Sequence, residues 1–182
     1  GPLSVTPNPT QHFFAICPRG LEALLADELR AVGATHINAD HGGVAFSGTL
    51  ATAYAANLHS RIASRVLWHL AEGGYRDADD LYELARGIAW HEQVSAQLTL
   101  RVDVTARASA LQSLDFATLR IKDGIVDQLR EATGDRPSID RTHPDVRVYA
   151  HLDNETASLY LDLSGEPLFK RGWRRDKGEA PL

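Results

Sequence analysis

The sequence predicts an α+β protein built from two successive units. Within residues 12–71, the apolar positions follow the order strand, helix, strand, strand, helix, strand. The pair Gly73-Gly74 then separates this pattern from a second set of alternating strands around a long amphipathic helix. Hydrophobic residues make up 43% of the chain and charged residues 24%, as in ordinary globular proteins.

The first strand and the first helix are predicted from two different periods. Residues 12–17 read as a short apolar strand. A helix is expected from Gly20 onward, and Gly33 ends it because glycine readily adopts the left-handed backbone that closes many helices. The apolar residues at helical spacing are Leu21, Leu24, Leu25, Leu29 and Val32.

A hairpin, a second helix and a closing strand complete the first unit. His41-Gly42-Gly43 predicts the hairpin turn, because glycine tolerates positive φ, and Thr49 is a good N-cap for the second helix. This βαββαβ order is the ferredoxin-like arrangement, an antiparallel sheet with both helices on one side. The elements expected here are residues 36–40, 44–46, 50–62 and 65–70.

The second unit, residues 75–165, mixes helices and strands. Asp79 or Asp80 can cap its first helix, and Gly134 ends the long one. Asp153-Asn154 predicts a turn that joins two strands into a hairpin. The expected elements after the first helix are a strand at 97–107, a helix at 115–132 and strands at 145–152 and 156–163.

Bulk charge and cysteine content limit the function classes. The net charge of −5 argues against a strongly basic nucleic-acid binder. A locally basic face is still compatible with it, because residues 166–182 carry five Lys or Arg against three carboxylates. Cys17 is the only cysteine, so we expect a buried thiol, no disulfide and a reducing cytoplasm. No apolar run is long enough to span a membrane.

Motifs of catalysis and metal binding are absent from the sequence. It contains no Gly-x-Gly-x-x-Gly, no Gly-x-x-x-x-Gly-Lys-Ser/Thr and no Gly-x-Ser-x-Gly. Its eight histidines are scattered, and the acidic group Asp77, Asp79 and Asp80 suits a helix N-terminus better than a metal. We therefore expect no catalytic residue and no metal site.

Lys122 is a candidate phosphate ligand within the long helix. It falls inside an apolar arc, where an unpaired ammonium would cost several kcal/mol. Either the stem packs and the ammonium escapes or meets an Asp, or the ammonium reaches a phosphate at the surface. The arc comprises Phe116, Leu119, Ile121, Ile125, Val126 and Leu129.

Two further basic regions are candidates for RNA contact. One is the open face of the second sheet, where Arg107 and Arg147 would lie with Arg101, Tyr149, His151 and Tyr160. Asp103 and Asp162 share that face, so it can equally be a solvated polar surface. The other is the tail Lys170, Arg171, Trp173, Arg174 and Arg175, in which Trp173 offers a stacking surface. The alternative for the tail is a linker that packs on a further domain.

Several blocks of sequence resemble those of THUMP-domain RNA methyltransferases, in particular the bacterial 23S ribosomal RNA guanine-N2 methyltransferases of the L type. The resemblance covers about residues 12–182. At Trp173 the family often has Tyr, which also stacks. The blocks include Arg19-Gly20-Leu21-Glu22, His41-Gly42-Gly43-Val44, Lys122-Asp123-Gly124-Ile125-Val126-Asp127, Arg136-Pro137-Ser138-Ile139-Asp140-Arg141, Pro144-Asp145-Val146-Arg147-Val148 and Leu161-Asp162-Leu163-Ser164-Gly165-Glu166-Pro167-Leu168-Phe169-Lys170-Arg171-Gly172-Trp173-Arg174.

The resemblance implies a function that the residues alone do not. In this family a ferredoxin-like domain and a THUMP domain together bind RNA, and an S-adenosylmethionine-dependent Rossmann-like domain with an Asn/Asp-Pro-Pro-Tyr/Phe signature follows them. This chain has no Pro-Pro pair. We therefore expect it to bind 23S ribosomal RNA, to hold no cofactor itself and to be inactive without the methyltransferase domain.

The domain boundaries follow from the same comparison. Residues 1–11 would be a cleavage scar and loose N-terminus, 12–72 the ferredoxin-like domain, 73–168 the THUMP domain and 169–182 a linker. Two alternatives stay open: a module that only docks the catalytic domain, and the THUMP module of a tRNA-modifying enzyme. The residues predicted to contact RNA are Arg107, Lys122, Arg141, Arg147, Lys170, Arg171, Trp173, Arg174 and Arg175.

Overall fold

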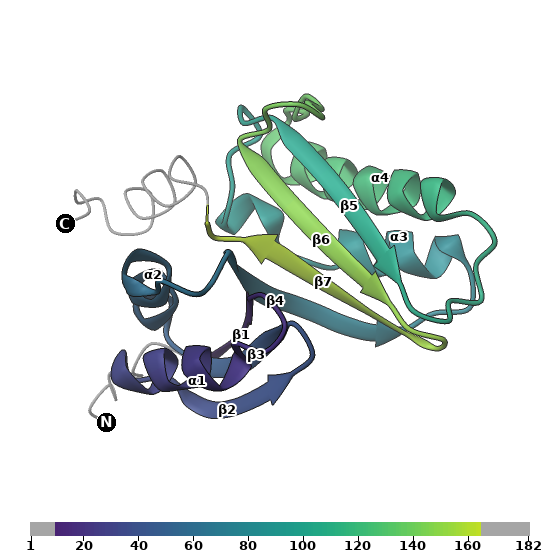
Figure 1. Ribbon diagram of the computed structural model, residues 1–182. Helices are drawn as coiled ribbons and strands as arrows, with labels where there is room; N and C mark the ends of the chain where they lie inside the picture. Colours follow the sequence, from purple (N-terminus) through teal and green to yellow (C-terminus); the bar gives the residue numbers. More distant parts are fainter. Residues whose placement is uncertain (1–9, 165–182) are drawn as a thin grey trace, which may run out of the picture. The chain divides into compact units, whose positions relative to one another are not determined.

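The computed structural model describes residues 10–164 (Figure 1). The chain divides into two compact units between Trp68 and His69. The strand β4 (Arg65–Gly74) runs across this division and ends at the glycine pair from which the sequence predicts the junction.

The first unit has the ferredoxin-like arrangement that the sequence predicts. Strand β3 pairs antiparallel with both β1 and β2, and the strand order is β2-β3-β1-β4. Gly42 forms the hairpin turn with a φ of 80°. Besides the start of β4, the elements of this unit are β1 (Gln11–Ile16), α1 (Glu22–Ala31), β2 (Thr35–Asp40), β3 (Gly43–Gly48) and α2 (Leu50–His59).

Glu28 on α1 holds the two helices of the first unit next to each other. Its carboxylate accepts hydrogen bonds from the Ser60 hydroxyl at 2.5 Å and from the Arg61 amide at 3.1 Å, directly after α2. Thr49 caps α2 as expected, in a reciprocal pair with Thr52. The helix ends earlier than predicted, because Ser60 is extended and its hydroxyl accepts from the amides that follow.

The predicted apolar face of α1 is wrong at one position. Leu25 and Leu29 are fully buried, but 55% of Leu24 is exposed. Ala26 is buried in its place, so the buried stripe of the helix is rotated toward Ala26. In the sheet, the Phe13 and Phe46 rings stack with their centroids 5.2 Å apart, which anchors the core of this unit on β1 and β3.

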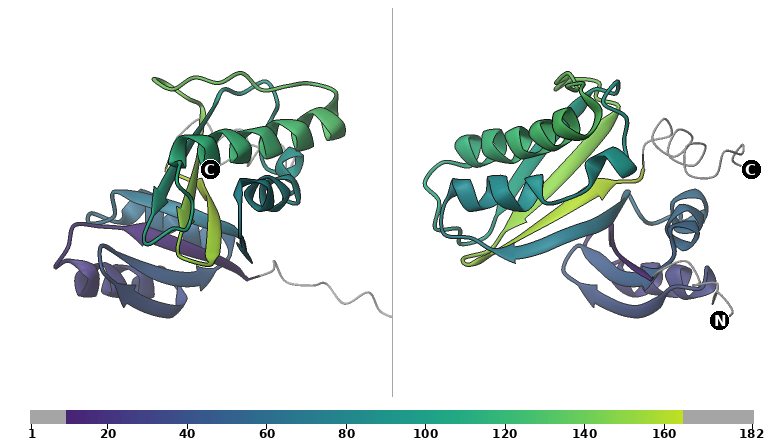
Figure 2. Two further views of the ribbon diagram at one scale, coloured as in Figure 1. Left: turned by 90° about the vertical axis from the view of Figure 1, so that its right-hand side faces the viewer. Right: turned by 180° about the vertical axis from the view of Figure 1, so that it is seen from behind.

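The second unit combines parallel and antiparallel strand pairs. Its strand order is β4-β7-β6-β5, with β5 parallel to β6 and β6 antiparallel to β7. Helix α4 makes the crossover that a parallel pair requires. Helices α3 and α4 cover one face of this sheet (Figure 2). The elements are α3 (Ala78–Arg86), a 3-10 turn η1 (Trp90–Glu92), β5 (Leu100–Ala106), α4 (Leu114–Thr133), β6 (Val146–Leu152) and β7 (Thr156–Asp162).

Two predictions for the second unit are corrected by local hydrogen bonds. The cap of α3 is Asp77, whose carboxylate accepts from the Asp80 amide, so Asp79 and Asp80 lie in the first turn. Strand β5 begins at Leu100, three residues later than predicted, because Thr99 is bound through its amide and hydroxyl to the Asp145 carboxylate. The long helix and its left-handed end at Gly134 are as expected.

The core of the second unit lies between the helix pair and the sheet. Trp90 is fully buried, and its indole nitrogen donates to the Ala85 carbonyl at 2.8 Å. Along β6 and β7 the residues alternate between the buried helix side and the open face. Ile121, Ile125 and Leu129 of α4 are buried as predicted, whereas Phe116 and Leu119 are 52% and 46% exposed. The apolar arc of α4 is thus buried only over its second part.

Candidate functional site

A groove lies between the first half of α4 and the edge strand β5. It has a volume of about 880 Å³. The helix contributes residues at i, i+4 and i+8 spacing, including Leu114, Thr118 and Lys122. Its charged lining residues are three cations, Arg101, Lys122 and Arg141, and two carboxylates, Asp103 and Asp115.

Lys122 lies in this groove with its stem buried and its ammonium paired. The Nζ atom is 2.7 Å from Oδ1 of Asp123, and 23% of the side chain is exposed. An ammonium that meets an Asp is one of the two outcomes that the apolar arc predicts. Its contact with RNA stays a prediction.

Arg101 and Arg141 are brought together at the start of β5. The Arg101 Nη1 donates to the Arg141 carbonyl at 2.6 Å, and its Nε donates to the Asp103 carboxylate at 3.0 Å. The segment that carries Arg141 runs beside β5 through a bridge between Leu100 and Ile139. The Arg141 side chain is exposed beside the groove.

A tight turn fixes the direction in which Arg141 leaves the strand edge. The Asp140 carboxylate accepts hydrogen bonds from the amides of His143 and Thr142, at 3.0 and 2.9 Å. These hydrogen bonds, His143 first, hold the pKa of Asp140 below its usual value. The turn therefore keeps a carboxylate ionised beside Arg141 but occupies it with backbone donors.

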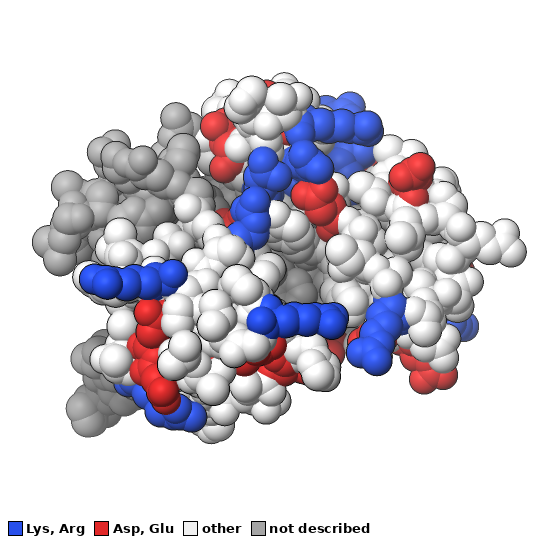
Figure 3. All heavy atoms as spheres, in the orientation of Figure 1, with Lys and Arg blue, Asp and Glu red and all other residues white. Residues whose placement is uncertain are grey.

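The other predicted cations of the open sheet face fall into two places. Arg147 lies directly opposite Arg101 in the parallel register, so it neighbours Arg101 on the sheet although it does not line the groove. Arg107 follows the other end of β5, about 20 Å along the strand from Arg101, and its amide donates to the Leu152 carbonyl. Figure 3 shows Lys and Arg side chains gathered over the beginnings of β5 and β6, with acidic side chains among them.

The structure thus groups part of the predicted RNA-contact set. Lys122 and Arg141 share the groove, and Arg147 neighbours Arg101 on the sheet, whereas Arg107 is separate. The tail residues Lys170, Arg171, Trp173, Arg174 and Arg175 lie outside the described residues. Sequence reasoning missed the apolar wall of the groove, formed by Leu114, Leu119 and Ile139. The one sequence signal for this wall was the width of the predicted apolar arc of α4, which includes Leu119.

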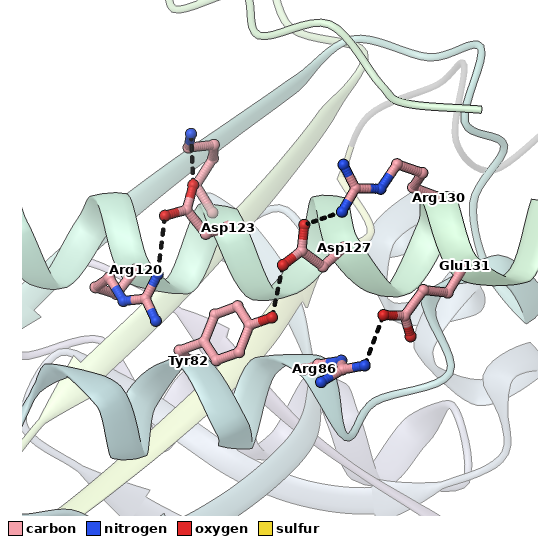
Figure 4. Close-up of polar contacts among 8 residues, drawn as sticks. Tyr82, Arg86, Arg120, Asp123, Asp127, Arg130 and Glu131 are labelled. Atoms are coloured by element: carbon pink, nitrogen blue, oxygen red, sulfur yellow. Dashed lines mark hydrogen bonds and ion pairs between the residues drawn. The ribbon is translucent and has the colours of Figure 1, made fainter. Parts of the chain in front are cut away.

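A charged network links α4 to α3 on the side away from the groove (Figure 4). The Arg120 guanidinium lies over the Tyr82 ring, 4.3 Å from its centroid, and pairs with Asp123 at 3.2 Å. The Tyr82 hydroxyl donates to Asp127 at 2.5 Å, and this hydrogen bond raises the pKa of Tyr82. The network holds the two helices together with charges that are mutually paired.

Residues 10–164 carry neither a cluster of metal-ligating side chains nor a helix suited to a membrane. That part of the chain contains no group of three His, Cys, Asp or Glu side chains placed to hold a metal ion. Its helices include none that is long and apolar enough to cross a bilayer. Cys17 is a buried free thiol, and burial raises its pKa.

Comparison with protein families accounts for both units. The model of the RlmL ferredoxin-like domain matches residues 12–67, and the model of the THUMP domain matches residues 75–162. The chain is an RlmL-type ferredoxin-like domain followed by a THUMP domain. The α4–β5 groove and the α3–α4 network both lie in the THUMP domain.

Curated relatives with this pair of domains are methyltransferases of ribosomal RNA by name. The chain is 47% identical over 170 residues to the ribosomal RNA large subunit methyltransferase K/L of Syntrophotalea carbinolica, covering 93% of this chain and 24% of the relative. It is 42% identical over 169 residues to the protein of the same name from Pseudomonas aeruginosa, covering 93% and 23%. The chain therefore spans about a quarter of the length of these relatives.

Solved structures show the same fold in proteins of more distant sequence. A predicted N6-adenine-specific DNA methylase from Listeria monocytogenes matches with a TM-score of 0.75 and 24% identity, covering 96% of this chain and 46% of that chain. TrmN from Thermus thermophilus matches with a TM-score of 0.68 and 22% identity, covering 96% and 51%. The fold of the two domains thus recurs within longer chains.

Proposed function

We propose that this chain binds large-subunit ribosomal RNA and positions it for S-adenosylmethionine-dependent methylation of a guanine N2 atom by a separate catalytic domain of a longer protein. The names of the curated relatives support the ribosomal substrate, and the THUMP match supports RNA binding. The observation that carries the proposal is the set of three cations, Arg101, Lys122 and Arg141, that line one groove of an otherwise acidic chain. Arg147 lies opposite Arg101 on the neighbouring strand.

The chemistry of the groove suits a nucleotide backbone. An arginine guanidinium can bind a phosphate through two parallel hydrogen bonds, and a lysine ammonium acts as a point charge. The apolar wall of Leu114, Leu119 and Ile139 can cover the face of a ribose or a base. Such contacts position an RNA chain without reading its sequence, which suits a domain that presents RNA to another site.

S-adenosylmethionine does not fit the described residues. A cofactor of this size in an α/β fold needs a glycine-containing turn after a parallel strand, where the backbone can approach it closely. The turn after β5 spans residues 107–113 and contains no glycine, and the sequence has no Pro-Pro signature for a target base. We propose that the cofactor binds in another domain of the longer protein, in the cytoplasm where its RNA substrate is found.

Filter binding of 23S ribosomal RNA fragments at two salt concentrations tests the proposal. We expect binding that weakens steeply with salt, and a loss of affinity in Lys122→Ala that is larger than its loss of thermal stability. Arg130→Ala is the matched control, because it removes one cation from the same helix two turns away, where Arg130 pairs with Asp127. Salt-independent binding, or equal losses in both variants, contradicts the proposal.

Two further outcomes of this experiment would assign the two domains a different function. If the chain binds no RNA below tens of micromolar, its role is to dock the catalytic domain. If transfer RNA displaces the ribosomal fragment at equal concentration, ribosomal RNA is not the preferred ligand, although the groove still binds RNA. Both outcomes are read from the same titration with a competitor added.

A further inference from the structure

Asp123 pairs with a cation of the groove without lining the groove itself. Its Oδ1 atom lies 2.7 Å from Nζ of Lys122, and its Oδ2 atom accepts from Arg120 at 3.2 Å. The residues that line the groove include Lys122 but neither Asp123 nor Arg120. One carboxylate therefore joins a groove residue to the network between the helices.

The position of Asp123 is fixed from α3. The Arg120 guanidinium lies over the Tyr82 ring and also pairs with Asp79 at 3.3 Å, both of them on α3. Only 25% of the Arg120 side chain is exposed, so it has little freedom to leave these partners. Asp123 is thus held in place by a cation that is itself anchored on another helix, while Lys122 has a flexible four-carbon stem.

The three N–H donors of the Lys122 ammonium can serve a carboxylate and a phosphate at once, but the two anions then lie close to each other. A carboxylate and a phosphate both accept its hydrogen bonds, and a phosphate in the groove that reaches Lys122 comes close to the fixed charge of Asp123. The negative charges of the phosphate and of Asp123 then repel each other. Because Lys122 and Asp123 are partly buried, salt screens this repulsion only in part. Binding therefore costs part of the existing ion pair.

We propose that Asp123 competes with an RNA phosphate for Lys122 and so sets the affinity of the groove. This inference rests on the proposed RNA-binding function and adds a residue, Asp123, that weakens the binding. The penalty applies to every polyanion, because it acts on a phosphate contact and not on a base. A protein that must release its RNA after each methylation gains from a contact held below its full strength.

The test uses Asp123→Asn, which keeps the shape of the side chain and removes its charge. We expect Asp123→Asn to bind a 23S ribosomal RNA fragment about three- to tenfold more tightly than the unmodified chain, with a steeper dependence on salt. Glu131→Gln is the matched control. It removes one carboxylate from the same helix, two turns further on, where Glu131 pairs with Arg86, and it should change the affinity by less than about twofold.

A double variant locates the effect on Lys122. In the Lys122→Ala background, Asp123→Asn should gain less than about twofold, because no ammonium remains for the carboxylate to occupy. Weaker or unchanged binding in Asp123→Asn overturns the inference, since it would mean that Asp123 positions Lys122 for RNA or does nothing. If Asp123→Asn fails to fold by circular dichroism, Asp123→Ser is measured against the same expectation.

The outcomes separate this inference from the proposed function. If the unmodified chain binds RNA and loses affinity with Lys122→Ala but Asp123→Asn does not tighten binding, only the role of Asp123 is wrong. If neither the unmodified chain nor Asp123→Asn binds the fragment, both the function and the inference are wrong.

Discussion

The two sides of α4 differ in how many of their side chains have partners on a neighbouring element. Toward α3, the charges of Arg120, Asp123 and Asp127 are paired, and Gly124 lets the helices approach closely. Toward β5, the first half of the helix leaves Leu119 exposed and Lys122 beside an open groove. The paired, or closed, side accounts for the contact between the two helices, and the open side carries the RNA contact that we propose.

The difference arises from spacing along the helix. Residues 120, 123, 124, 127 and 131 recur at three- and four-residue intervals and face α3, whereas 114, 115, 118, 119 and 122 face the groove. Substitutions on the closed side should change the free energy of unfolding. Substitutions on the open side should change RNA affinity.

The largest expected effect is on the closed side, at Gly124. A Cβ at this position would lie 2.6 Å from the Tyr82 carbonyl and 2.9 Å from the Ala85 Cβ, so Gly124→Ala forces α3 and α4 apart. We expect a loss of about 1–3 kcal/mol in the free energy of unfolding, despite the higher helix propensity of alanine. Urea denaturation followed by circular dichroism measures it.

The control for Gly124 is Gly87→Ala at the end of α3. Gly87 has an ordinary helical φ of −73°, and an added Cβ meets nothing closer than 3.4 Å. This variant should be at least as stable as the unmodified chain. Equal losses at Gly87 and Gly124 would show that the α3–α4 contact is no tighter than any other.

The next effect is on the open side, where Lys122→Ala and Arg141→Ala together should lower RNA affinity about tenfold. Each removes a cation of the groove, so the slope of log affinity against log salt should fall by about 0.7 per lost phosphate contact on single-stranded RNA. The free energy of unfolding should change little, because both side chains reach the surface. A large loss of unfolding free energy with an unchanged salt slope of RNA affinity would mean that these residues stabilise the fold and do not contact RNA.

The fold was predictable from the sequence, because periodicity and turn residues agree along most of it. Thr49, His41-Gly42-Gly43 and Gly134 act locally, through side-chain caps and positive φ, and they fall where expected. The errors occur where a distant partner decides. Asp145, far along the chain, binds Thr99 and delays the start of β5, and Glu28 of α1 accepts a hydrogen bond from Ser60, where α2 ends.

The candidate site was predictable only in part, for a related reason. A helical wheel places Lys122 in an apolar arc, but it cannot tell which part of the arc a sheet will cover. Leu119 is exposed in the groove because β5 is an edge strand, so no further strand covers this side of α4. Arg107 and Arg147 share an alternation pattern, but only the register shows that Arg147 lies beside Arg101.

A smaller effect on the closed side is expected for Tyr82→Phe. The variant keeps the ring under Arg120 but removes the hydrogen bond to Asp127, which should cost about 1 kcal/mol of unfolding free energy at neutral pH. Because the pKa of Tyr82 is raised in the folded chain, its contribution is complete below pH 10 and is lost as the pH rises through the higher folded value. The gap between the two proteins should therefore narrow above pH 10 in urea titrations, and a gap that widens there is the contrary result.

The smallest effect concerns Arg86 and Glu131 at the end of the same network. Their ion pair is short, at 2.6 Å, but the two side chains are 41% and 53% exposed, so solvent and salt screen it and its ordering costs side-chain entropy. A double-mutant cycle of Arg86→Ala and Glu131→Gln should give a coupling that shifts Tm by no more than about 2 °C and disappears in 1 M salt. Coupling that persists in high salt would mean that solvent does not reach this ion pair. The α3-facing side of α4 would then be shielded from solvent as far as Glu131, and not only around Arg120.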